Sequence, residues 1–123
     1  MELKIFRFNQ LQVNTYLLID ESTRDAVIID PGCQSDDEKA LLKEYIETNN
    51  IRLVRMLNTH LHFDHVYGNR FIEETYGIGA EGAKEDMFFL NHYTDLLALF
   101  DMPLDEDALP LKNKLREGDV ISV

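Results

Sequence analysis

Short runs of bulky apolar residues, separated by polar turns, divide the first third of the chain. Residues 3–8 (LKIFRF) and 13–19 (VNTYLLI) combine alternation with aromatic or β-branched side chains, which predicts two strands. Residues 26–29 (AVII) form a continuous apolar run, which is typical of a strand buried on both faces. The order strand, turn, strand indicates an antiparallel meander at the start of the fold.

A helix is predicted directly after the meander. Pro31 and Gly32 interrupt the extended pattern, and Ser35 followed by Glu38 forms a capping box. The two aspartates after Ser35 carry negative charge that favours the positive end of a helix dipole. The helix is expected to end at the asparagine pair 49–50, with an apolar face made of Ala40, Leu41, Tyr45 and Ile46.

Further strands and helices are expected to alternate along the rest of the chain. They are a strand at 52–57, a helix from Val66 to near Gly77, a short strand at 78–80, a helix at 83–100, a loop at 101–119 and a strand at 119–123. The core candidates of the 83–100 helix are Met87, Phe88, Leu90, Leu96, Leu97 and Leu99. This interleaving predicts an α/β or α+β layered fold, with residues 1–123 as a single domain.

Composition restricts the class of protein. Hydrophobic residues make up 45% of the chain and aromatic residues 10%, which is enough for a packed core. No segment reaches the roughly 18 apolar residues of a membrane span, and the N-terminus lacks the pattern of a signal peptide. Cys33 is the only cysteine, so an intrachain disulfide is excluded, and an inert thiol is expected. These features predict a cytoplasmic protein with no membrane partner.

The net charge of −11 makes nucleic acid an improbable partner, because a surface this acidic repels phosphate groups. A bound pair of divalent cations would reverse the sign of the potential locally. The simplest interpretation of the acidic surface is solubility.

The segment LNTHLHFDHVYGN, at residues 57–69, holds three of the four histidines of the chain. In an extended backbone, His60 and His62 point the same way and can address one ion. A turn after Phe63 would direct Asp64 and His65 toward a second, neighbouring ion. Neutral imidazole and carboxylate are the expected ligands of zinc, iron or manganese. Isolated histidines are usually packing or surface residues, but three of them with an aspartate in six positions favour metal ligation.

Asp64 has a second predicted role, as the catalytic group that orients a water molecule and takes its proton. Thr59 is expected either to shape the loop through a hydrogen bond or to be an ordinary turn residue. His92 lies in the segment FFLNHYTDLLALF, which has a helical pattern, and is predicted to lie on a helix surface. The spacing of the cluster differs from the helical H-E-x-x-H signature of metalloproteases.

The segment THLHFDH resembles the H-x-H-x-D-H signature of the metallo-β-lactamase superfamily, and its flanks resemble the hydroxyacylglutathione-hydrolase-like branch. The resemblance covers most of residues 3–80. It implies that His60 and His62 belong to a first metal and that Asp64 and His65 belong to a second. It also implies two divalent ions, with zinc expected and iron or manganese as alternatives, and a structural role for Asp30 close to the ligands. His62 replaces the glutamate typical of flavo-diiron proteins, which favours a hydrolase.

The remaining ligands of that family are absent from the chain. They are a histidine in a G-H-[ST]-P-G turn, a bridging aspartate and a final histidine. The chain is therefore expected to be the N-terminal half of an αββα sandwich, in which a mixed sheet carries helices. With two ligands per ion, weak metal binding is expected, and activity of this 123-residue form is doubtful. Exposed sheet surface would favour a homodimer or higher assembly.

Three functions are weighed. The first is metal-dependent hydrolysis of a small ester or thioester by the complete parent protein, with a small molecule as substrate. The second is a non-catalytic metal-binding or assembly module. The third is a nuclease branch of the superfamily, which the acidic charge and the absence of basic patches disfavour.

Overall fold

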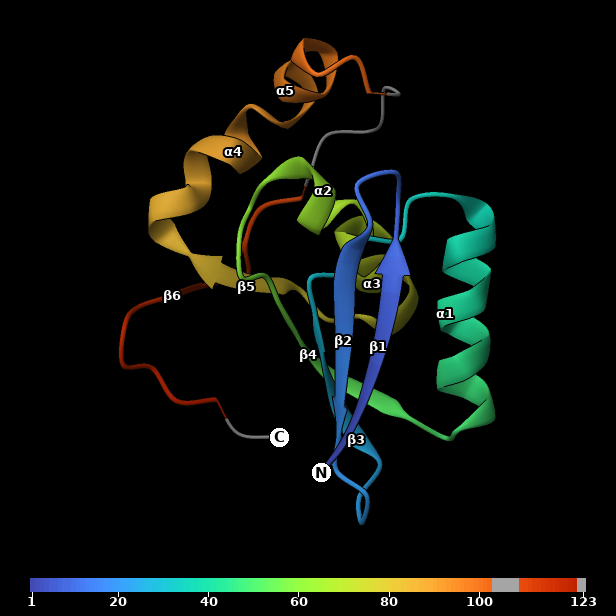
Figure 1. Cartoon of the computed structure of the whole chain (residues 1–123). Coiled ribbons are helices and arrows are strands. Elements are labelled where there is room, and N and C mark those ends of the chain that lie inside the picture. The colour runs from blue at the N-terminus through green and yellow to red at the C-terminus, as the bar shows by residue number, and fades with distance from the viewer. Residues whose placement is uncertain (103–108, 122–123) are drawn as a thin grey trace.

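The computed structural model describes residues 1–102 and 109–121 and contains one sheet of six strands in the order β1-β2-β3-β4-β5-β6 (Figure 1). The strands are β1 (Glu2–Phe8), β2 (Val13–Ile19), β3 (Asp25–Ile29), β4 (Arg52–Leu57), β5 (Ala80–Ala83) and β6 (Asn113–Leu115). The helices are α1 (Asp36–Thr48), α2 (Phe63–Val66), α3 (Asn69–Tyr76), α4 (Met87–Asn91) and α5 (Tyr93–Leu99), with a 3-10 turn η1 (Lys84–Asp86). The predicted layered fold is thereby confirmed.

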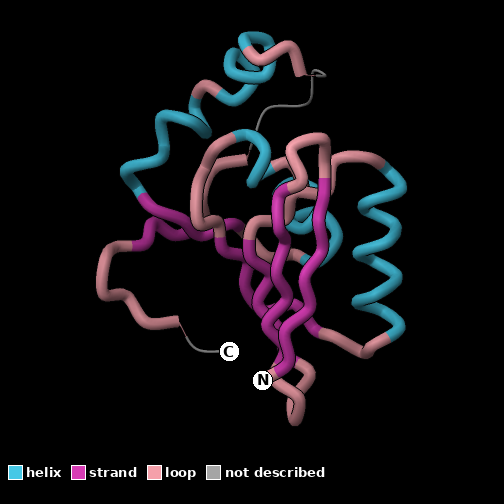
Figure 2. Tube along the Cα trace, viewed as in Figure 1, coloured by secondary structure: helices cyan, strands magenta, loops and turns pink. Residues whose placement is uncertain are grey.

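The sheet is mixed, because its two halves are connected differently (Figure 2). Strands β1, β2 and β3 are joined by short turns and pair antiparallel, as the predicted meander requires. Strand β4 then pairs parallel to β3, because α1 returns the chain to the starting end of the sheet. Strands β5 and β6 continue the parallel order. The carboxyl ends of β3 and β4 therefore lie side by side, where ligands of open α/β sheets commonly bind.

Helix α1 begins with the predicted capping box. The Ser35 hydroxyl accepts a hydrogen bond from the Glu38 backbone N–H at 3.2 Å, and the Glu38 carboxylate accepts from the N–H groups of Gln34 and Asn9. The contact with Asn9 ties the helix start to the β1–β2 turn. The predicted apolar face is partly wrong, because Leu42 and Ile46 are the buried residues and Leu41 is 54% exposed.

The hydrophobic core lies between the sheet and helices α1 and α3. Phe6 of β1 packs edge-on against Tyr45 of α1, and Ile72 of α3 is fully buried. The largest fully buried members of this main core are Phe8, Leu17, Ile19, Ile28, Leu42, Ile46, Met56 and Ile72. At about 25 cal/mol per Å² of apolar area, burying one such side chain contributes about 1.5–3 kcal/mol.

A second, smaller cluster joins α2 to helices α4 and α5. It consists of Leu61, Phe63, Val66, Tyr67, Leu90, Tyr93 and Leu97. Four of its members, Leu61, Phe63, Val66 and Tyr67, come from the histidine segment. The two short helices are thereby held over that segment, as Figure 1 shows for α2 and α5.

The second half of the chain departs from several predictions. The predicted helix at 83–100 is broken at His92 into α4 and α5, and two of its core candidates, Phe88 and Leu99, are exposed. The predicted strand at 78–80 lies instead at 80–83. Strand β6 falls within the predicted loop at 101–119. Of the predicted strand at 119–123, residues 119–121 are not in a strand and residues 122–123 lie outside the described residues.

Within residues 1–102 and 109–121, no helix has the length and apolar character needed to cross a lipid bilayer.

An ion pair between half-buried Arg55 and buried Glu81 links β4 to β5. The Arg55 guanidinium donates to both carboxylate oxygens of Glu81, at 2.9 and 2.6 Å, and Asn113 of β6 donates to Glu81 at 3.1 Å. The Arg55 guanidinium holds the pKa of Glu81 below its ordinary value. A depressed carboxyl pKa stabilises the folded state above the unfolded value, near 4.5, and this contribution is lost as pH falls through the folded value.

We expect Glu81→Gln to lower the free energy of unfolding by about 1–3 kcal/mol at about pH 7, since Arg55 would lose its charged partner. Below pH 4.5 the difference from the unsubstituted chain should shrink, because Glu81 then takes up a proton in the unfolded state before it does so in the folded state. Urea unfolding at a series of pH values measures this, with the exposed Glu85→Gln as control. A difference that is the same at all pH values would contradict the assigned ion pair.

Strand β1 ends the sheet, and its outer edge has no strand partner among the described residues. Phe6 and Phe8 point into the core, whereas Leu3 and Ile5 lie on the opposite face and are 54% and 48% exposed. Such an edge is a template for pairing with another chain.

We propose that this edge promotes self-association, so sedimentation at micromolar concentration should show dimers or larger species. Ile5→Lys should shift the distribution toward monomer, because a lysine on an edge strand opposes pairing. Phe88→Lys, at another exposed apolar position, should leave the distribution unchanged. A chain that sediments only as monomer would refute self-association.

Candidate metal centre

The histidine segment begins immediately after β4. The Asn58 backbone N–H donates to the carbonyl of Glu81 at 2.9 Å, which holds the exit of β4 against β5. Beyond this point buried and exposed residues alternate: Leu61 and Phe63 are buried, and His60 and His62 are exposed. The apolar residues anchor the segment in the second cluster, and the intervening imidazoles remain exposed.

The three histidine rings gather in one place. The rings of His60 and His62 are stacked, with centroids 5.6 Å apart and an interplanar angle of 18°. Helix α2 begins at Phe63 and turns the chain, so that the His65 ring lies 5.2 Å from His60 and 6.5 Å from His62. Asp64 Oδ2 lies 3.7 Å from His65 Nε2. The structure therefore brings all four predicted ligands together around the start of α2.

Asp30, which directly follows β3, holds the histidine segment against the sheet. Its carboxylate is almost completely buried and accepts hydrogen bonds from the Thr59 backbone N–H, at 2.7 Å, and from the Thr59 hydroxyl. Its backbone has a φ of 53°, which is uncommon outside glycine, and a hydrogen bond from its N–H to the Leu57 carbonyl stabilises this conformation. Thr15 donates to the Asp30 carbonyl at 2.7 Å.

Asp30 also lies against His65. The distance from Asp30 Oδ2 to His65 Nδ1 is 3.1 Å, although the buried Nδ1 makes no hydrogen bond of acceptable geometry with the described residues. Asp30 raises the pKa of His65 above its ordinary value, against the opposing effect of burial. A carboxylate behind an imidazole orients the ring and raises its basicity, as in the carboxylate–histidine pairs of metal sites.

Three asparagines that were not singled out in the sequence hold the remaining backbone of the segment. Asn9 donates from its amide to the carbonyls of Gly32 and Asp64, each at 3.0 Å. Asn58 donates to the His65 carbonyl at 3.1 Å and exchanges hydrogen bonds with Asn69, which is 2% exposed. The signal available in the sequence was weak, namely an asparagine at each end of the histidine segment.

Gly68 closes the segment between α2 and α3. Its N–H donates to the Pro31 carbonyl at 2.7 Å, and a Cβ at this position would lie 2.5 Å from Cys33 Sγ and 2.7 Å from that carbonyl. Only glycine allows this approach of the two loops. Cys33 is fully buried, and burial raises the pKa of its thiol to about 12, in agreement with an inert role.

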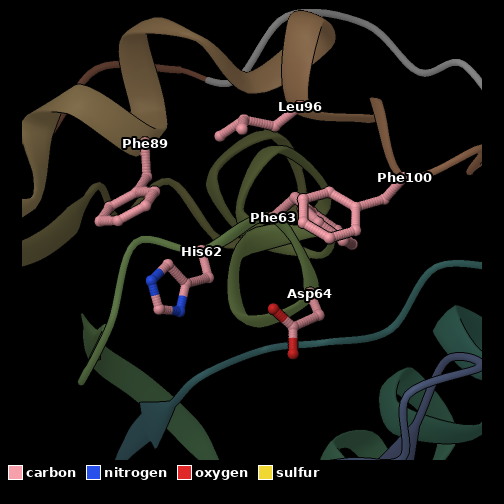
Figure 3. Close-up of a pocket in the computed structure, with 6 residues that line it drawn as sticks. All are labelled: His62, Phe63, Asp64, Phe89, Leu96 and Phe100. Carbon is pink, nitrogen blue, oxygen red and sulfur yellow. The ribbon is translucent and has the colours of Figure 1, made fainter. Parts of the chain in front are cut away.

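A cavity of about 240 Å³ opens beside the histidines (Figure 3). His62, Phe63 and Asp64 form its floor, and Phe89, Leu96 and Phe100 from the α4–α5 region form its roof. The Phe89 ring meets the His62 ring edge-on, with centroids 4.2 Å apart. The cavity is thus continuous with the candidate ligands and mainly apolar.

The four motif side chains fit a divalent ion by chemistry and proximity but do not form a finished cage. Imidazole and carboxylate are suitable donors, and the buried Nδ1 of His65 has only Asp30 beside it. Among residues 1–102 and 109–121, however, no group of three or more histidine, cysteine, aspartate or glutamate side chains is arranged to hold a metal ion.

His92 lies apart from this group. It occupies the break between α4 and α5, where Nδ1 is 3.6 Å from Asp95 and the ring contacts Phe88. Its side chain is 48% exposed, so the predicted surface position is confirmed.

Comparison with known proteins identifies similar sequences. A sequence model of the Metallo-beta-lactamase superfamily matches residues 8–122. The hydroxyacylglutathione hydrolase of Pelagibacter ubique (strain HTCC1062) is 42% identical over 87 residues, covering 70% of this chain and 34% of that protein. The hydroxyacylglutathione hydrolase GloC of Haemophilus influenzae is 27% identical over 124 residues, covering 100% of this chain and 56% of that protein. The chain thus spans about a third to just over half of these relatives.

Solved structures share the fold. TTHA1623 in a di-iron-bound form has a TM-score of 0.78 at 24% identity, over 96% of this chain and 56% of that chain. The BLEG-1 B3 metallo-beta-lactamase has a TM-score of 0.77 at 22% identity, over 99% of this chain and 56% of that chain. At these identities the likeness concerns the fold, and it agrees with the mixed sheet and helices described above.

We expect Gly68→Ala to lower the free energy of unfolding by about 1–3 kcal/mol, the usual cost of forcing an extra carbon into a packed site. Adding Cys33→Ala should recover only part of this loss, because it removes the sulfur contact and leaves the Pro31 carbonyl in place. Gly82→Ala is the matched control, since its nearest neighbour would be a flexible leucine methyl at 3.3 Å. Equal destabilisation by both glycine substitutions in urea unfolding would contradict the close approach at Gly68.

Proposed function

Because the chain belongs to the metallo-beta-lactamase superfamily, we propose that its histidine segment is the ligand-bearing part of a hydrolase acting on a small ester or thioester. The identity to hydroxyacylglutathione hydrolases, 42% for the Pelagibacter ubique protein and 41% for the cytoplasmic Arabidopsis thaliana protein, supports this substrate class. Membership of the family supports metal-dependent hydrolysis as the class of reaction. The assignment of an ester or thioester substrate concerns a whole protein of this type, of which this chain resembles one part.

Each predicted residue has a proposed role. His60 and His62 would hold one ion, and Asp64 and His65 a second. Zinc is the proposed metal, with manganese or iron as alternatives, and the di-iron form of the similar TTHA1623 structure keeps iron in consideration. Asp30 would orient His65 through the 3.1 Å contact.

A divalent ion bound at this place would supply Lewis acidity and lower the pKa of water to about 7. The side chains contribute the remaining parts of the chemistry. Asp64, which lines the cavity, would accept the proton of the attacking water. Thr59 would hold the loop through its two hydrogen bonds to Asp30. The apolar roof of the cavity would limit water beside the reacting carbonyl.

The number of ligands determines what the 123-residue chain itself can do. Two protein ligands per ion are fewer than the three usual at catalytic zinc. We therefore expect weak metal binding and slow or absent turnover in this form. A non-catalytic metal-binding module remains the second candidate.

One observation carries the proposal: three imidazoles and a carboxylate meet beside an apolar cavity, with the neighbouring apolar residues buried. A histidine cluster with a merely structural role would be expected to pack inward, whereas His60 and His62 are exposed.

We expect zinc titration by calorimetry to detect binding that the double substitution His60→Ala/His62→Ala weakens at least about tenfold, because imidazole ligands are lost. His92→Ala, which alters the histidine outside the cluster, should bind zinc like the unsubstituted chain. Thermal unfolding should be little changed by the double substitution, since both side chains are exposed.

An assay of S-acyl thioester hydrolysis, in which the released thiol is measured, separates the two candidates. Zinc-dependent turnover that the double substitution removes would support the hydrolase. Because slow or absent turnover is expected of this form, binding without turnover would support the module only when an extended form of the protein gives the same result. Zinc affinity equal in all three proteins would refute the ligand assignment.

A further inference from the structure

The cavity beside the histidines has a wall that the proposed chemistry does not require. Its roof is formed by Phe89, Leu96 and Phe100, which come from a different segment of the chain than the ligands (Figure 3). Phe89 packs against His62, and Phe100 packs against Phe63 with ring centroids 5.5 Å apart. The roof therefore follows the floor closely, and any group bound there contacts both.

The volume indicates the size of the group that the cavity can hold. An engineered apolar cavity of about 150 Å³ binds benzene. The cavity here measures about 240 Å³ and is open on one side, so it accommodates a phenyl ring or a branched chain of similar size. A small hydroxyacyl group of three carbons would leave much of the apolar wall without contact, which forfeits dispersion energy.

The charges around the cavity indicate the polarity of that group. Among the described residues that line the cavity, Asp64 is the only carboxylate and His62 the only imidazole, and none is a lysine or arginine. A carboxylate on the far end of the acyl group would lie against the aromatic and aliphatic roof, where none of the described side chains could pair with it. A neutral, apolar group is the one that these surroundings favour.

We propose that the cavity binds the acyl side chain of the substrate and selects esters or thioesters whose acyl group is aromatic or branched aliphatic. This inference rests on the proposed function, in which the acyl carbonyl lies at the histidines. In the reaction, the oxygen of water bonds to the acyl carbon and the carbon–sulfur or carbon–oxygen ester bond breaks. The products are a carboxylic acid and the thiol or alcohol, which takes up a proton. Phe89, Leu96 and Phe100 then determine specificity without taking part in bond breaking.

Unreactive amides test the cavity in the chain as it exists, without metal and without turnover. N-methylphenylacetamide carries an aromatic acyl group, and N-methyllactamide carries a small hydroxylated one. In amide-proton NMR titrations with a chelator present, the phenyl compound should bind at least about fivefold more tightly. Its shifts should centre on residues 62–64, 89, 96 and 100.

Two neighbouring residues provide a matched pair of variants. Phe100 lines the cavity and Leu99 does not, yet both are largely exposed, at 61% and 74%, so neither substitution should unfold the chain. Phe100→Ser should weaken binding of the phenyl compound at least about threefold, and Leu99→Ser should leave it unchanged. Leu96→Asn, which alters the roof from α5, should act like Phe100→Ser.

Equal binding of the two amides, or equal effects of Phe100→Ser and Leu99→Ser, would overturn the inference. The zinc titration reports separately on the proposed function. The phenyl compound could therefore bind selectively although zinc failed to bind, which would contradict the proposed function alone. Zinc could also bind as expected while the two amides bound equally, which would contradict the inference alone.

Discussion

The candidate site depends on the contacts that the buried carboxylate of Asp30 makes with Thr59 and His65. This carboxylate sits at the end of β3, between the core strands and the histidine segment, and receives two hydrogen bonds from Thr59. The same carboxylate lies 3.1 Å from His65. A buried charge is tolerated only when it is paired or hydrogen-bonded, so the loop is held where it satisfies Asp30. One side chain thus joins the stability of the fold to the position of a ligand.

The histidine segment gains its shape from packing on both sides. Its apolar members, Leu61 and Phe63, enter the second cluster under α4 and α5, while Asn9 and Asn58 hold its backbone from the core side. The imidazoles are left on the surface between these attachments. The α4–α5 region, which covers the segment, also supplies the roof of the cavity that we propose for the acyl group.

Local patterns were sufficient for the first half of the fold. The strands at 13–19 and 52–57 have the predicted bounds, and the capping box at Ser35 starts α1 as expected, because alternation and capping are local properties. Strand β6 was missed because its sequence, Asn-Lys-Leu, is polar and its conformation comes from pairing with β5. The break at His92 was missed because apolar residues continue on both sides of it.

For the candidate site, too, only the local pattern along the chain could be predicted. The spacing of His60, His62, Asp64 and His65 predicts metal ligands, and that role stays a prediction. The resemblance to the superfamily is confirmed by the match over residues 8–122. The asparagine contacts and the roof at Phe89, Leu96 and Phe100 could not be predicted, because they join segments that are far apart in the chain.

The central claim is that the side chains of His60, His62, Asp64 and His65 converge on divalent ions. Zinc K-edge X-ray absorption of the zinc-loaded chain tests this claim most directly. The account predicts imidazole scattering with nitrogen ligands at about 2.0–2.1 Å, lost in His60→Ala/His62→Ala, whereas a shell of water oxygens without imidazole would contradict it.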